Sequence, residues 1–167
     1  MLGLTQLGVV HTAISLVAVA VAAGIVAFAR YKQIAVRTCT GILYVVTTAL
    51  TCLTGFGIFQ HGGFGAPHAL GILTLLVLAI IAETRHSFGR LSRYIAVLGF
   101  STTFFFHMIP AFTETSTLLP FGHPLASGPD DPGLKAAIGV AFLVFVVGAV
   151  LQILQVRAER NLTAAPI

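Results

Sequence analysis

Long apolar stretches, separated by short polar segments, run along the whole chain. No charged residue lies between Leu2 and Ala29, and none lies between Thr38 and Ala82. The second stretch is too long for one membrane-spanning helix, which needs about 20 apolar residues, and the glycines and proline within 60–68 indicate a turn that divides it. Two further apolar stretches follow. The pattern therefore predicts five helices, at residues 4–29, 38–59, 67–84, 94–112 and 134–156.

Two prolines have distinct predicted roles in these helices. Asp131 precedes Pro132 at the start of the last apolar stretch, which is typical of an N-cap followed by proline at the first helical position. Pro110 lies inside the fourth stretch, three residues after His107. Because proline has no backbone N–H, we expect it to interrupt the helix and to free the Phe106 carbonyl to line a polar cavity.

The basic residues fall on one side of the five predicted spans. Eight of the nine lysines and arginines share one side of the predicted spans, and Lys135 is on the other, outer side. The eight are Arg30, Lys32, Arg37, Arg85, Arg90, Arg93, Arg157 and Arg160. Since cytoplasmic loops are enriched in lysine and arginine, we predict that the amino terminus is outside and the carboxyl terminus is cytoplasmic. A count of four spans would divide the basic residues between the two faces.

The composition excludes a water-soluble domain. Hydrophobic residues make up 57% of the chain and charged residues 8%, whereas an ordinary soluble domain has about 25% charged residues. We therefore predict an all-α integral membrane bundle, with residues 1–167 as a single transmembrane domain and the lipid bilayer as its main partner. The net charge of +4 is explained by orientation and by anionic lipid headgroups, so it gives no reason to expect nucleic-acid binding.

Histidines are the most informative polar residues of the sequence. In the predicted orientation His86 lies on the inner side, and the other five lie toward the outer face. His11 and His107 are each about 10 Å deep in a predicted span, and His68 is in the first turn of the third span. Polar residues within a membrane are costly and usually face the bundle interior. We therefore predict an apolar pocket that opens outward and is ringed by His11, His68 and His107.

Two kinds of cofactor suit this pattern. Histidines on opposed helices can supply both axial ligands of a haem, and we expect His11 with His107, or His68 as the alternate. The chain has no Cys-x-x-Cys-His motif, so the haem would be of the b type, and the apolar surroundings also suit a quinone. The alternative is zinc or copper, with ligands from His61, Glu114 and His123.

These residues leave three functions open. The first is a redox protein that uses the histidine-lined site to bind haem b or a metal. The second is an accessory or structural subunit, without catalysis, that packs on another membrane protein through glycine-rich helix faces. The third is a lipid-modifying enzyme that uses a metal-bound water. A histidine within a membrane also commonly serves only to hydrogen-bond between helices, and this interpretation applies to His11 and His107.

Several short motifs resemble one group of proteins. They are Leu-Gly-Val-Val-His-Thr at 7–12, Arg37 followed by Gly41 and Tyr44, His-Ala-Leu-Gly at 68–71, and Arg-His at 85–86. Together they resemble small multi-span membrane proteins of bacteria that form a family with a domain of unknown function. The resemblance implies a bacterial origin and a multi-pass location in the inner, or plasma, membrane.

Overall fold

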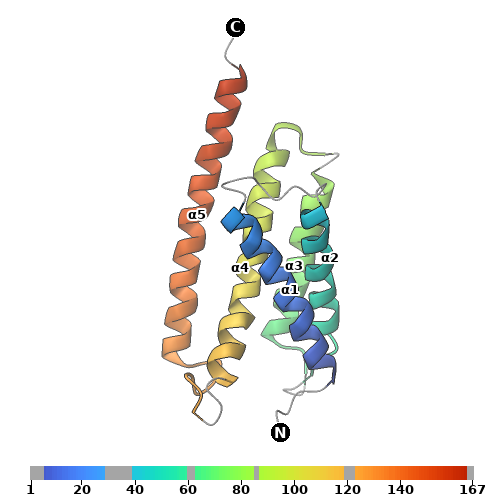
Figure 1. Ribbon diagram of the computed structural model, residues 1–167, viewed down its shortest axis with the longest axis vertical. Helices are drawn as coiled ribbons and strands as arrows, with labels where there is room; N and C mark the ends of the chain where they lie inside the picture. Colours follow the sequence, from blue (N-terminus) through green and yellow to red (C-terminus); the bar gives the residue numbers. More distant parts are fainter. Residues whose placement is uncertain (1–5, 29–38, 60–62, 85–86, 119–122, 165–167) are drawn as a thin grey trace. The chain divides into compact units, whose positions relative to one another are not determined.

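The computed structural model describes residues 6–28, 39–59, 63–84, 87–118 and 123–164. Within these ranges the chain is helical and contains no strand, which confirms the all-α prediction (Figure 1). The elements in order are α1 (Gln6–Phe28), α2 (Cys39–Gly55), α3 (Ala66–Glu83), the 3-10 turn η1 (Gly89–Leu91), α4 (Ser92–Leu118) and α5 (Pro132–Ala164).

Three of the described helical segments are long and apolar enough to cross a membrane. They are Ala66–Glu83, Gly89–Thr117 and Pro132–Asn161. Two shorter apolar segments, Gln6–Ala22 and Cys39–Gly55, belong to the first two helices. The protein is therefore a helical membrane protein, while the five-span topology and the positions of the termini stay predictions.

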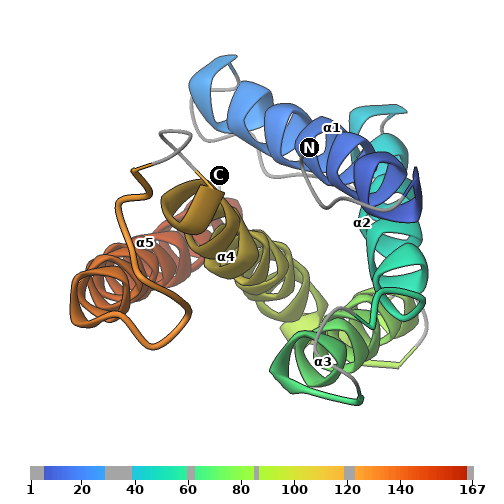
Figure 2. The same ribbon diagram turned by 90° about the horizontal axis from the view of Figure 1, so that it is seen from below.

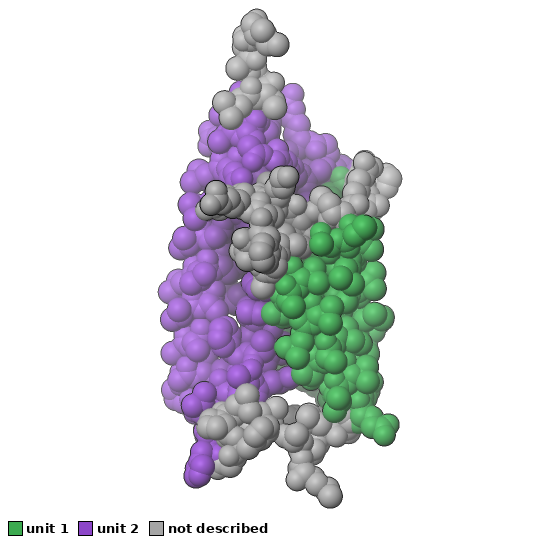
Figure 3. Space-filling model, viewed as in Figure 1, with its two compact units in different colours: residues 1–85 green, residues 86–167 purple. Residues whose placement is uncertain are grey.

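The chain divides into two compact units, residues 1–85 and 86–167, which are coloured separately in Figure 3. The first unit contains α1, α2 and α3, and α2 packs against both of the others (Figure 2). The second unit contains η1, α4 and α5, and its two long helices pack along each other. A single domain over residues 1–167 stays a prediction.

Glycines allow close approach at the end of α2. A Cβ atom added to Gly55 would lie 3.1 Å from His11 Cε1, and one added to Gly57 would lie 2.7 Å from Leu7 Cδ2. Small residues commonly let membrane helices approach in this way. In α5, by contrast, a Cβ atom at Gly139 would meet no described atom within 4 Å. Gly55 therefore serves packing between α1 and α2 within the chain.

Two helices extend farther than hydropathy predicts. The predicted spans end at residues 112 and 156, whereas α4 continues to Leu118 and α5 to Ala164. Pro110 lies inside α4 without ending it, so the predicted interruption is wrong. The polar end of α5 remains helical because its side chains find partners on α4, including an ion pair between Arg93 and Glu159. Hydropathy measures the apolar span and not the length of the helix.

The predicted start of α5 is confirmed. Asp131 Oδ1 accepts hydrogen bonds from the backbone N–H groups of Gly133 at 2.8 Å and Leu134 at 3.4 Å, and Pro132 is the first helical residue. Asp131 Oδ2 accepts further bonds from the Ser127 amide and hydroxyl, each at 3.1 Å. These bonds favour the charged carboxylate and hold the pKa of Asp131 below its usual value.

Candidate functional site

The candidate site lies where α2 ends and α3 begins, within the first compact unit. After Gly55, the backbone N–H of Phe56 donates to the Cys52 carbonyl and that of Ile58 to the Gly55 carbonyl, so the chain turns tightly as it leaves the helix. Gly65 is the N-cap of α3, and the His68 amide donates to its carbonyl at 3.0 Å. The turn and the cap together bring phenylalanines of the connection onto His68.

His68 is buried among aromatic rings. Its side chain is 7% exposed. The imidazole centroid lies 5.0 Å from the ring of Phe59, 5.2 Å from that of Phe64 and 6.5 Å from that of Phe56. The three interplanar angles are 26°, 31° and 12°, respectively, so Phe59 and Phe56 are stacked on the imidazole and Phe64 is tilted against it. We call these four side chains the His68 cluster.

The hydrogen bond at Nδ1 sets the tautomer of His68. The backbone N–H of Gly65 donates to Nδ1 at 3.3 Å, an arrangement like the return bond of a capping box, with histidine at the third helical position. Since Nδ1 accepts, a neutral imidazole carries its proton on Nε2. His68 therefore caps α3 with one nitrogen and offers an N–H with the other.

The Nε2–H of His68 has no acceptor among the described residues. Nε2 is buried and has no hydrogen-bond partner among the residues that the structure describes. The stacked rings of Phe56 and Phe59 do not replace one, because an N–H lies in the imidazole plane and these rings do not turn their faces toward it. The tilt of Phe64, 31°, is also far from the perpendicular arrangement that would do so. A buried donor without a partner costs about 1–3 kcal/mol. Such a group is a position where a ligand with an acceptor oxygen would restore the missing bond.

His11 has the opposite tautomer. Its Nδ1 lies 3.0 Å from Thr54 Oγ1, and that hydroxyl donates its own proton to the Leu50 carbonyl at 2.8 Å. The hydroxyl is therefore the acceptor, and His11 Nδ1 is the protonated nitrogen. In the neutral form of the half-buried His11, Nε2 therefore carries the lone pair. Metal-bound histidines have this arrangement, since they commonly donate the other ring N–H to a fixed acceptor.

The two histidines flank the same short segment, the end of α2, without a described contact between them. His11 lies against it from α1 through Thr54 and Gly55, and His68 lies against it from α3 through Phe56. The first imidazole offers a lone pair and the second an N–H. They are suited to different partners, a metal or haem iron at His11 and an acceptor oxygen at His68.

The remaining predicted residues lie in the second compact unit or outside the described residues. His107 is buried, at 5% exposure, in α4 of the second compact unit, so its pairing with His11 stays a prediction. Glu114 and His123 are exposed, and His61 lies outside the described residues. Across the described ranges no group of three or more histidine, cysteine, aspartate or glutamate side chains could hold a metal ion. Because His61 lies outside these ranges, the metal set of His61, Glu114 and His123 stays a prediction.

Sequence reasoning missed the aromatic neighbours of His68. The consecutive phenylalanines at 104–106 are the most conspicuous aromatic run of the sequence, but Phe105 packs against Phe142 and Phe145 between α4 and α5, at centroid distances of 5.6 and 5.2 Å. The useful signal was the set of phenylalanines on both sides of the predicted turn, at 56, 59 and 64.

No protein-family model, curated protein or solved structure matches the chain, so the bacterial family resemblance stays a prediction.

Proposed function

We propose that this protein is a redox protein of the membrane and that its His68 cluster binds a lipid-soluble quinone. The proposal rests on the buried Nε2–H of His68, which lacks an acceptor among the described residues. A quinone ring is planar and apolar, and its carbonyl oxygens accept hydrogen bonds and donate none. It would supply the missing acceptor while stacking against phenylalanine rings.

The exposure of the rings gives a quinone a way in. Phe59 and Phe64 are 58% and 68% exposed, so rotating either ring disturbs little packing. Phe56 is held more firmly, because its ring packs directly against Gly71. A Cβ atom added to Gly71 would lie only 2.9 Å from Phe56 Cε1. We assign Phe59 and Phe64 as the movable walls of the site and Phe56 as its fixed wall.

Haem b is the second ligand that we propose, and it belongs to His11. The bond from Nδ1 to Thr54 Oγ1 leaves Nε2 as the atom that would coordinate iron. Under this proposal His11 would hold the haem, while His68 would hold the quinone. Zinc or copper at His11 is the alternative, which metal analysis of the purified protein would reveal.

The membrane setting belongs to the same proposal. Five spans with an outer amino terminus would put the His68 cluster at the outer face of a bacterial plasma membrane, because eight basic residues then share the cytoplasmic side. An accessory subunit without catalysis is the competing function. It predicts that His68 serves only as a helix cap and that the protein binds no quinone.

The test is binding of decylubiquinone to the purified full chain in detergent, measured by equilibrium dialysis. His68→Leu removes the donor, and the loss of a net hydrogen bond weakens binding about 2- to 13-fold. His68→Gln keeps an acceptor for the Gly65 amide and an N–H for the ligand, so binding is retained. His123→Gln, in an exposed loop, is the matched control and has no effect.

Each outcome decides between the two functions. Absence of binding to the wild-type chain contradicts the quinone proposal and favours the accessory role. Equal binding by wild type and His68→Leu, with helical circular dichroism intact, shows that His68 is only a cap. An absorption spectrum of the same sample tests the second ligand, because a Soret band that is lost in His11→Ala supports haem b at His11.

A further inference from the structure

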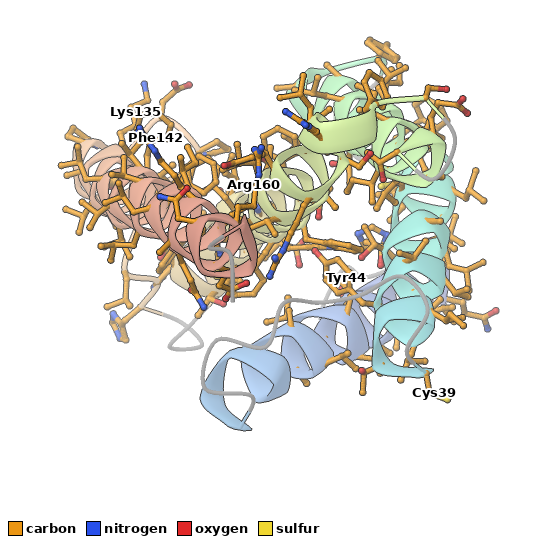
Figure 4. The ribbon with its side chains drawn as sticks, turned by 90° about the horizontal axis from the view of Figure 1, so that it is seen from above. Cys39, Tyr44, Lys135, Phe142 and Arg160 are labelled. Carbon is orange, nitrogen blue, oxygen red and sulfur yellow. The ribbon has the colours of Figure 1, made fainter. Side chains whose placement is uncertain are left out.

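A groove lies between the start of α4 and the end of α5, within the second compact unit. It has a volume of about 470 Å³ and is lined by Leu91, Tyr94, Ile153, Arg157, Arg160 and Asn161. Figure 4 looks at the molecule from the end where α5 finishes, and labels Arg160 near this end and Lys135 at the opposite end of the helix. The groove is distant in sequence from the His68 cluster and does not depend on the proposed function.

The charged residues that line the groove are both arginines. The guanidinium of Arg160 lies over the ring of Tyr94, 5.9 Å from its centroid, which holds the side chain on the α4 side of α5. Arg157 is exposed and one turn earlier on the helix. The nearby carboxylate of Glu159 does not line the groove and is paired with Arg93. The groove therefore attracts an anion.

Beside the arginines the surface is apolar. Leu91 is 60% exposed and Ile153 is 38% exposed. Toward the middle of α5 the exposed residues are also large and apolar, among them Val150 at 50% and Leu151 at 60%. A ligand that fits both parts has an anionic head and a hydrocarbon tail, and lies along a helix that is long enough to cross the membrane.

We propose that this groove binds an anionic phospholipid. Arg157, Arg160 and the Asn161 amide contact the phosphate, and the acyl chains lie against Ile153 and the apolar surface of α5. Guanidinium groups bind phosphate oxygens in a bidentate manner, and basic pockets between membrane helices on the cytoplasmic side are typical sites for anionic headgroups. The arginines lie on the side that the charge distribution predicts to be cytoplasmic.

The test is native mass spectrometry of the full chain in detergent with added phosphatidylglycerol or phosphatidylcholine. We expect selective retention of phosphatidylglycerol. Arg157→Gln and Arg160→Gln each lower its apparent affinity about fivefold, the effect of one basic residue at an anionic surface. Lys135→Gln is the matched control, because it removes the same charge from the same helix at the other end, and it leaves retention unchanged.

Several results would overturn the proposal. They are equal retention of both lipids, unchanged retention in both glutamine variants, or an equal loss in Lys135→Gln, which would indicate a general effect of net charge. Full displacement of the lipid by inorganic phosphate would show a site for free anions. If the glutamine variants lose helical circular dichroism, Arg157→Lys and Arg160→Lys replace them. Lysine binds phosphate as a point charge, so retention falls, and unchanged retention contradicts the proposal.

Discussion

Replacing Gly71 by alanine tests whether the His68 cluster is packed as described. The added Cβ atom would lie 2.9 Å from Cε1 of Phe56 and 3.4 Å from its Cζ, so the ring has to move. Alanine in place of glycine inside a helix stabilises by about 0.8–1.0 kcal/mol, whereas overpacking costs about 1–3 kcal/mol. The sum predicts a change between about zero and a loss of 2 kcal/mol.

Gly139→Ala is the matched control. Gly139 is also within a helix, and a Cβ atom there would meet no described atom within 4 Å. Only the higher helix propensity of alanine applies here, so this variant is more stable than wild type by about 0.8–1.0 kcal/mol. The difference between the two variants, about 1–3 kcal/mol, is the cost of displacing Phe56.

The assay is unfolding of both variants in detergent, followed by circular dichroism, together with decylubiquinone binding. Phe56 is stacked on His68, so Gly71→Ala also weakens quinone binding while Gly139→Ala does not. Equal stabilisation by the two substitutions would refute the reasoning, because it would mean that Phe56 does not occupy the space beside Gly71.

Three further predictions concern His11, the start of α5 and the orientation. Thr54→Val removes the acceptor of His11 Nδ1–H at nearly constant side-chain volume, so it lowers the free energy of unfolding by about 0.5–1.5 kcal/mol. Nitrogen NMR of labelled histidine then shows a mixture of His11 tautomers instead of one. The folded-state pKa of Asp131 is lowered by hydrogen bonds, so its contribution to stability is present above the unfolded value of 3.8 and is lost as the pH falls through the folded value. Asp131→Asn therefore reduces the fall in melting temperature at acidic pH. An unchanged fall in this variant would assign the acid sensitivity to other carboxylates. In a background without native cysteines, Thr117→Cys reacts with an impermeant thiol reagent from outside the cell and Ser87→Cys does not, whereas the reverse pattern would invert the predicted topology.

The helices could be predicted from the sequence because apolar length and local breakers determine them. The break between α2 and α3 and the Asp131 cap were predictable from glycine, proline and aspartate in their local context. The end of α5 could not be predicted in this way, since its last turns make contacts with α4, such as the ion pair of Arg93 with Glu159. Pro110 shows the same limit, because α4 continues through it despite the missing N–H.

The candidate site was predictable in residue type but not in chemistry. His11 and His68 stand out because histidine is rare in apolar segments. Their tautomers depend on Thr54, which is 43 residues away from His11, and on the backbone amide of Gly65. No pattern in the sequence specifies which ring nitrogen such a partner meets. The distinction between a ligand for iron and a donor for a carbonyl therefore required coordinates.

The most direct test of the central claim is nitrogen NMR of histidine-labelled protein, with and without decylubiquinone. His68 is assigned from the signal that disappears in His68→Gln. We expect its Nε2 to be protonated and its Nδ1 unprotonated, and we expect the Nε2–H signal to shift when quinone is added. An unprotonated Nε2, or a signal that quinone does not move, would contradict the assignment of His68 as the quinone donor.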